Sequence, residues 1–239
     1  MAQNTSNAVM QRRVEANDSL DDFPTPPWAT RALCRFLIDG HYPWLKDQTV
    51  REPAANRGHM VRPLSEYFHD VIASDVHDYG VGYDVRDYLY GPPPDMVDWT
   101  ITNPPFRLAH EFIERALATS RRGVAVIVRS AFLEGDKRHR ELFSTTPPAY
   151  VLQLVDRCGM LKARLIKQGA PDPFNLDDQG EPRKASSATA YCWVVWMHGQ
   201  HDTRFRWLSG RSELERDGDY PLYREQWEKI RPAMEGALL

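Results

Sequence analysis

Val124-Ala125-Val126-Ile127-Val128 is apolar at every position. A strand with one face in water alternates apolar and polar residues, whereas a strand covered on both faces does not. Before it come Leu108–Thr119, which has the spacing of an amphipathic helix, and Asp98–Thr102, which favours a strand. Strand, helix and buried strand in succession predict an α/β fold with a mostly parallel sheet and helices on both faces.

The same alternation extends along the chain in both directions. We expect further strands at Thr49–Glu52 and Asp70–Ser74. We expect further helices at Trp28–Asp39, at Met60–Phe68 and, after the central strand, at Lys137–Phe143. The order of these elements supports the α/β assignment because strands alternate with helical segments that can cover the sheet.

Two later runs, Tyr150–Val155 and Thr189–Trp196, are rich in β-forming residues and have no long helical pattern between them. They predict an antiparallel edge on the sheet, with the tryptophans of the second run packed against it. The stretch between them, residues 156–187, is rich in Gly, Pro, Asp and basic residues. We expect a long loop there, and long loops in compact domains are usually functional or disordered.

The length of 239 residues suits one complete core. Residues 1–20 are polar without a sustained period, which predicts a flexible N-terminal arm. We expect the main domain over residues 21–200 and a C-terminal extension over residues 201–239.

No stretch approaches the roughly 20 apolar residues that cross a bilayer, and the polar N-terminus lacks the pattern of a signal peptide. We therefore expect a soluble, cytoplasmic protein without a membrane partner. Cys34, Cys158 and Cys192 are odd in number and far apart, which favours buried thiols over disulfides or a zinc site. No metal is expected.

Charge is distributed unevenly along the chain. The formal net charge of −3 argues against a histone-like binder. Residues 1–120 carry 11 Lys and Arg against 17 Asp and Glu, whereas residues 121–169 carry 10 against 4. An acidic part followed by a basic band suits a protein that binds a cationic cofactor and a polyanion. The alternative is an ordinary solvated basic surface.

The run Thr100–Phe106 ends in an amide, two prolines and an aromatic ring. Prolines fix their own φ and push the preceding residue out of the helical region, so this turn is stiff and extended. The side-chain oxygen of Asn103 and the carbonyl of Pro104 can then accept hydrogen bonds from one NH₂ group, while Phe106 offers a face for stacking. The alternative is a strand that ends in a proline turn, with Phe106 as a core aromatic.

Acidic and small residues follow the earlier strands. The stretch Val50–Gly58 combines small residues, which let a ligand approach the backbone, with the carboxylate of Glu52. Asp75 comes at the end of the next strand, where it can accept both hydroxyls of a ribose. Asp87 is placed to hold an adenine amino group, and Asp84 competes with it for that role.

In this order, these residues resemble the S-adenosylmethionine-dependent DNA adenine-N6 methyltransferases, most of all the small phage-type members with a gamma-like motif order. The resemblance spans residues 23–196. It implies a Rossmann-like class I methyltransferase fold with a seven-stranded sheet, S-adenosylmethionine as cofactor and DNA as partner. It also implies a bacterial cell or phage-infected host as the location, and target recognition as a role for the loop at residues 156–187. The implied catalytic residues are Asn103, Pro104, Pro105 and Phe106. The implied cofactor-binding residues are Phe23, Thr25, Pro26, Glu52, Pro53, Ala54, Asn56, Gly58, Asp75, Asp87 and Tyr88.

The cofactor loop departs from the family pattern at one position, where Asn56 replaces the first glycine. Asparagine tolerates positive φ, so the turn can form, but the closeness of approach to the cofactor is an open question.

The implied reaction is direct transfer of a methyl group to an adenine that is flipped out of the duplex and stacked on Phe106. It needs no general base, so His59, His77 and His139 are expected to be surface or loop residues. Basic residues that can contact DNA phosphates are Arg129, Lys137, Arg138, Arg140, Lys162, Arg164 and Lys167. For the first lysine-arginine cluster, a solvated helix face is an equal alternative.

Two alternatives stay open. Related Asn-Pro-Pro-aromatic turns occur in enzymes that methylate RNA bases or glutamine side chains, although the basic band favours a nucleic acid. Cytosine is a weaker candidate because cytosine enzymes more often carry Ser in place of Asn103. The other alternative is a DNA-binding protein that keeps the fold without catalysis, which the change at Asn56 permits.

Overall fold

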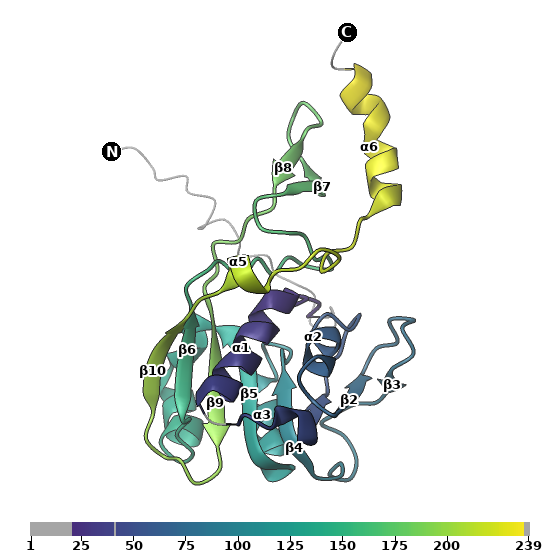
Figure 1. Ribbon diagram of the computed structural model, residues 1–239. Helices are drawn as coiled ribbons and strands as arrows, with labels where there is room; N and C mark the ends of the chain where they lie inside the picture. The colour runs from purple at the N-terminus through teal and green to yellow at the C-terminus, as the bar shows by residue number, and fades with distance from the viewer. Residues whose placement is uncertain (1–20, 41, 237–239) are drawn as a thin grey trace, which may run out of the picture.

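The computed structural model describes residues 21–40 and 42–236 and centres on one eight-stranded sheet (Figure 1). Its strands are β1 (Thr49–Glu52), β2 (Asp70–Asp75), β3 (Asp84–Val85), β4 (Val97–Thr102), β5 (Ser120–Arg129), β6 (Tyr150–Leu154), β9 (Tyr191–Met197) and β10 (Arg204–Leu208). They lie in the order β10-β6-β9-β5-β4-β1-β2-β3, and every neighbouring pair is parallel except the two that include β9. The predicted arm at residues 1–20 lies outside the described residues.

Helices cover both faces of this sheet. They are α1 (Pro27–Gly40), α2 (Val61–Ser65), α3 (Ala109–Ala118), α4 (Asp136–Arg138), α5 (Arg211–Leu214) and α6 (Arg224–Gly236), with the short elements η1 (Leu45–Asp47), η2 (Ser130–Leu133) and η3 (His139–Phe143). One core contains the apolar face of α1 and Leu64 of α2, and the other contains Ile113 of α3 and Leu142 of η3.

Strand β5 supplies both cores. Ala125 and Ile127 belong to the core under α1, whereas Val124, Val126 and Val128 belong to the core under α3. All five side chains are at most 1% exposed. Burial of successive residues on opposite faces explains the unbroken apolar run, and the predicted α/β fold is confirmed.

The sheet has eight strands rather than the expected seven. The predicted antiparallel pairing of β6 with β9 is confirmed, with Leu152 opposite Trp193. Beyond β6, the strand β10 adds a parallel edge, with Phe205 opposite Val151. The sheet therefore continues past residue 200, into the segment that the sequence assigned to a C-terminal extension.

The stretch 156–187 is not wholly a loop, which corrects the prediction. It contains a two-stranded antiparallel sheet of β7 (Pro171–Leu176) and β8 (Pro182–Lys184). The turn is stabilised by Asp177, whose Oδ1 accepts hydrogen bonds from the main-chain nitrogens of Gln179 and Glu181. In Figure 1 this hairpin projects from the main body beside α6.

Two predicted helices differ from the structure in length or type. The first, expected at Met60–Phe68, is the shorter helix α2. The second, expected at Lys137–Phe143, is divided into α4 and the π-helical turn η3.

The described part of the chain has no helix long and apolar enough to span a bilayer. Cys34, Cys158 and Cys192 are buried free thiols, as the sequence predicted.

Candidate functional site

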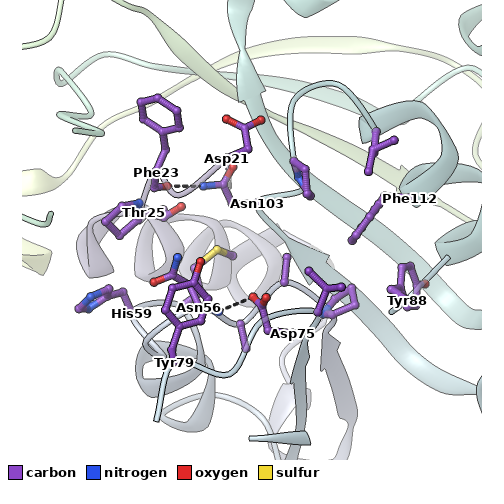
Figure 2. Close-up of a pocket in the computed structure, with 18 of the residues that line it drawn as sticks. Asp21, Phe23, Thr25, Asn56, His59, Asp75, Tyr79, Tyr88, Asn103 and Phe112 are labelled. Atoms are coloured by element: carbon purple, nitrogen blue, oxygen red, sulfur yellow. Dashed lines mark hydrogen bonds between the residues drawn. The ribbon is translucent and has the colours of Figure 1, made fainter. Parts of the chain in front are cut away.

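A pocket lies at the carboxyl ends of β1, β2 and β4, bordered by the chain segment that precedes α1 (Figure 2). This edge is where open α/β sheets bind ligands. Ten predicted site residues line the pocket: Phe23, Thr25, Pro53, Ala54, Asn56, Asp75, Asp87, Tyr88, Asn103 and Pro105. Five others do not line it directly, namely Pro26, Glu52, Gly58, Pro104 and Phe106. The two predicted groups, for cofactor and for catalysis, therefore meet in one cavity.

Asp75 is held in place by main-chain donors. Its Oδ2 accepts a hydrogen bond from the nitrogen of Asn56 at 2.9 Å (Figure 2). Its Oδ1 accepts one from the nitrogen of His77 at 3.0 Å. Each carboxylate oxygen has a second lone pair available for a ligand. Asp75 can thus accept two hydroxyl groups without reorienting.

Asn56 adopts the conformation that a glycine would supply. Its φ is 49°, in the left-handed region that asparagine tolerates. Its side-chain nitrogen donates to Oδ1 of Asp22 at 2.7 Å, which ties the cofactor loop to the N-terminal segment. The turn survives the loss of the first glycine because the asparagine side chain finds a local partner.

Gly58 allows the same loop to turn close to Tyr83. Its φ is 79°, and a Cβ atom at this position would lie 2.2 Å from the hydroxyl oxygen of Tyr83. Only glycine fits both the conformation and the space.

Glu52 lies beneath the loop rather than in the pocket wall. It is fully buried, and its Oε1 accepts hydrogen bonds from the hydroxyl of Thr102 at 2.6 Å and the nitrogen of Ala54 at 2.9 Å. Within the described residues, Oε2 has no hydrogen-bond partner. Burial raises the pKa of this carboxyl to about 8, although the hydrogen bonds from Thr102 and Ala54 oppose the rise. Glu52 therefore links the ends of β1 and β4.

The far end of the pocket is aromatic and acidic. Asp87 lines it and Asp84 does not, which favours Asp87 for the contact that the sequence left open. The Oδ1 atom of Asp87 accepts a hydrogen bond from the nitrogen of Leu89 at 2.9 Å. The ring of Tyr88 packs against that of Phe112, with centroids 5.0 Å apart. Such walls suit a flat ring that carries a hydrogen-bond donor.

Asn103 projects into the pocket from the end of β4. Its side-chain nitrogen donates to the carbonyl oxygen of Phe23 at 2.7 Å (Figure 2). Because a carbonyl only accepts, this contact fixes the amide orientation and leaves the side-chain oxygen as the acceptor toward the cavity. The turn is also held at Phe106, whose nitrogen donates to Oδ2 of Asp21 at 2.5 Å.

The hydroxyl of Thr25 is a further polar atom at the pocket wall. Thr25 is 2% exposed, and within the described part of the chain its Oγ1 has no hydrogen-bond partner. A buried hydroxyl without a partner is costly, so a ligand that supplies one is favoured here.

Several pocket residues were not among the predicted site residues, including His59, Met60, Tyr79 and Phe112. His59 was expected to be a surface or loop residue; it lies in the loop after β1, but it is buried there, at 4% exposed. Burial, together with nearby Arg62 and Arg57, lowers the pKa of His59 to about 4, so its ring is neutral. Burial also raises the pKa of Tyr79 to about 12. The small-residue loop alone gave no signal for these side chains.

The basic residues predicted to bind DNA have different surroundings. Four form ion pairs within the chain: Lys137 with Glu141, Arg140 with Asp136, Arg164 with Asp172, and Lys167 with Glu215. Arg138 donates to main-chain carbonyls of Phe132 and Glu134. Lys162 also has a partner. Arg129 differs because its guanidinium lies over the ring of Phe106, 4.3 Å from the centroid.

No family model and no curated protein sequence matches the chain. Among solved structures, the methyltransferase subunit of a type I restriction-modification system from Streptococcus thermophilus matches with a TM-score of 0.53 and 11% identity. The match covers 90% of this chain and 53% of that subunit, so the chain spans about half its length. A proposed RNA methyltransferase from Pyrococcus horikoshii matches with a TM-score of 0.51 and 15% identity, over 73% of this chain and 87% of the other.

The chain has a Rossmann-like methyltransferase fold. Identities of this size establish the architecture alone. What the pocket binds and transforms must be argued from its own side chains.

Proposed function

We propose that this chain transfers a methyl group from S-adenosylmethionine to the exocyclic N6 amino group of adenine in DNA. The observation that carries the proposal is the presence of Asn103 in the same cavity as Asp75. A methyl donor bound along Asp75 and an amine bound at Asn103 would then lie side by side.

The pocket residues fit this cofactor. Asp75 offers two fixed acceptors for ribose hydroxyls, and Asp87 with Tyr88 and Phe112 offers an acidic and aromatic site for an adenine ring. The partnerless Oγ1 of Thr25 offers a polar contact for the amino-acid part. The bound sulfonium supplies an activated methyl group, so the protein needs no metal and no covalent intermediate for the transfer.

The catalytic turn would position the amine. The side-chain oxygen of Asn103 and the carbonyl oxygen of Pro104 would accept hydrogen bonds from its two N–H groups, which directs the nitrogen lone pair at the methyl group. The same acceptors would stabilise the positive charge that develops on the nitrogen during transfer. Stabilisation of this kind is commonly worth about 3 kcal/mol for one group.

DNA is the proposed substrate because a nucleobase fits a cavity with aromatic walls, and because the cationic Arg129 lies beside the catalytic turn. An adenine inside a duplex cannot reach this cavity, so it would be flipped out. The solved structures that match include the methyltransferase subunit of a type I restriction-modification system and a proposed RNA methyltransferase. RNA is therefore the second candidate substrate.

The decisive experiment supplies methyl-labelled S-adenosylmethionine and unmethylated genomic DNA to the purified protein, then digests the DNA to nucleosides for mass spectrometry. We expect label on N6-methyladenine with the wild type and none with Asn103→Ala. A protein that binds the cofactor but labels only RNA or protein would contradict the DNA assignment. A protein that binds DNA but not the cofactor would support the non-catalytic alternative.

A further inference from the structure

The last residue of β5, Arg129, lies beside the aromatic part of the catalytic turn. Its guanidinium carbon is 4.3 Å from the ring centroid of Phe106 and 5.9 Å from that of Phe23. A planar cation at this distance from a ring face is a cation–π contact. Arg129 therefore occupies a face of Phe106.

Two aromatic rings also lie beside the ring of Phe106. The ring of Phe23 lies 5.5 Å from it at an interplanar angle of 40°, and the ring of Tyr191 lies 6.4 Å from it at 33°. These tilted rings support Phe106 rather than lie flat on it. Of these three centroid distances the one to the guanidinium of Arg129 is the shortest, so we take the face under Arg129 as the one at which a planar ligand would stack.

A base and the guanidinium cannot both fit in the present arrangement. A stacked base takes up about 3.4 Å, the rise for each base along a DNA strand, so a base between two planes needs about twice that separation. The guanidinium carbon of Arg129 lies 4.3 Å from the centroid of the Phe106 ring, which leaves no room for a base between them. A base that stacks on Phe106 must move the side chain of Arg129.

The head group of Arg129 is held lightly enough to move. The residue is exposed, and within the described residues no carboxylate forms an ion pair with it. Its guanidinium also forms a hydrogen bond with the hydroxyl of Tyr191, a contact that a side-chain rotation can break. Its main chain is fixed opposite Tyr191 in the sheet, so only the side chain needs to swing. An arginine that ends a rigid strand and covers an aromatic ring is placed to follow the outer face of an entering base.

We propose that Arg129 occupies the position of the target base in the free protein and covers the outer face of that base once it has entered, so that the base lies between Phe106 and the guanidinium. This inference rests on the proposed function and deepens it. A guanidinium plane stacks well on a nucleobase. If the substrate were instead a glutamine side chain of a protein, it would have no ring to fill the space between Phe106 and Arg129. Arg129 thus selects a planar aromatic substrate.

Substitutions at Arg129 separate stacking from charge. Arg129→Gln keeps a planar head without charge, Arg129→Lys keeps the charge without the plane, and Arg129→Ala removes both. Arg206→Ala is the control, since Arg206 is exposed on β10 and donates to the carbonyl of Phe205. The measurements are kcat and KM for methyl transfer to unmethylated genomic DNA, with the melting temperature as a check on folding.

We expect Arg129→Ala to lower kcat/KM by about 10- to 100-fold, the usual effect of losing a stacking side chain against a base. Arg129→Gln should retain more activity than Arg129→Lys, and Arg206→Ala should match the wild type. Full activity in Arg129→Lys together with loss of activity in Arg129→Gln would overturn the proposal and favour a contact with a DNA phosphate. Wild-type activity in all three Arg129 variants would also overturn it. A wild type that methylates no DNA would overturn the proposed function itself, which distinguishes the two failures.

Discussion

The side-chain nitrogen of Asn103 donates a hydrogen bond to the carbonyl oxygen of Phe23 at 2.7 Å, across 80 residues of sequence. This contact joins the segment before α1 to the end of β4. It fixes which atom of the amide faces the pocket, because the carbonyl can only accept. The N-terminal segment thereby helps to set the geometry of the proposed catalytic turn.

Asn103→Asp tests this arrangement. The substitution keeps an acceptor but removes the donor, and a carboxylate facing the carbonyl of Phe23 is repelled by it. We expect kcat for methyl transfer to fall by about 100-fold or more, as it does when one transition-state contact is lost. The affinity for S-adenosylmethionine, measured by calorimetry, should stay within a few-fold of the wild type. An equal loss of binding and transfer would contradict this role.

Asp75→Asn tests the cofactor site. The substitution preserves shape but removes the charge, so hydrogen bonds from ligand hydroxyls become weaker. Hydrogen bonds to a charged group are worth about 1.5–3 kcal/mol, which corresponds to a 10- to 100-fold rise in Kd for the cofactor. The matched control is Asp78→Asn, an exposed residue outside the pocket wall whose Oδ1 accepts from the nitrogen of Gly80. Equal affinities of both variants would exclude Asp75 from the binding site.

Asn56 allows conformational strain to be separated from hydrogen bonding. Asn56→Gly relieves the positive φ but loses the hydrogen bond to Asp22, so we expect little change in the free energy of unfolding. Asn56→Ala loses the hydrogen bond and keeps the strain, which should cost about 1–2 kcal/mol. Urea unfolding of both variants measures the difference. A stable alanine variant would mean that the loop is held by other contacts.

Much of this fold can be predicted from the sequence, because short local patterns of apolar and turn-forming residues indicate its strands and turns. The run Val124–Val128 can be buried on both faces in one kind of sheet, and the Asn103 turn follows a strand whose end position the fold dictates. Asp75 and Asn103 could be predicted to meet because parallel strands bring their carboxyl ends to one edge.

What the sequence missed depends on contacts between distant residues. Strand β10 alternates arginines with aromatics and gains its place only by pairing with β6. Arg164 and Lys167 were predicted to contact DNA phosphates, and in the structure they form ion pairs with Asp172 and Glu215. A local pattern contains no information about such partners. His59 is buried for the same reason, since the turn of its loop depends on the N-terminal segment.

Arg31→Ala should destabilise the protein far more than the removal of an exposed arginine. Arg31 is 4% exposed, and its guanidinium donates to both carboxylate oxygens of Asp219 at 2.7 and 2.9 Å. Removal of the arginine leaves Asp219 buried without its cation, which typically costs about 3–5 kcal/mol. Arg35→Ala breaks the exposed pair with Glu213 and should cost less than about 1 kcal/mol. Similar losses in urea unfolding of the two variants would contradict this ranking.

Glu52 should make the protein less stable as the pH rises. Burial raises its pKa in the folded protein to about 8 from an ordinary value of 4.5. Between these values the folded protein retains a proton that the unfolded chain has released, so the free energy of unfolding falls with increasing pH. The effect is absent below about pH 4.5, where both states are protonated.

Glu52→Gln removes this dependence because the amide is neutral at every pH and can still accept from Thr102 and Ala54 through its oxygen. We expect the variant to match the wild type near pH 4.5 and to exceed it at pH 8 by on the order of 4 kcal/mol. Urea unfolding across this range measures the two slopes, with the exposed Glu114→Gln as control. Parallel curves for Glu52→Gln and the wild type would mean that Glu52 is already ionised in the folded protein, and a cation near its second carboxylate oxygen would then have to be sought.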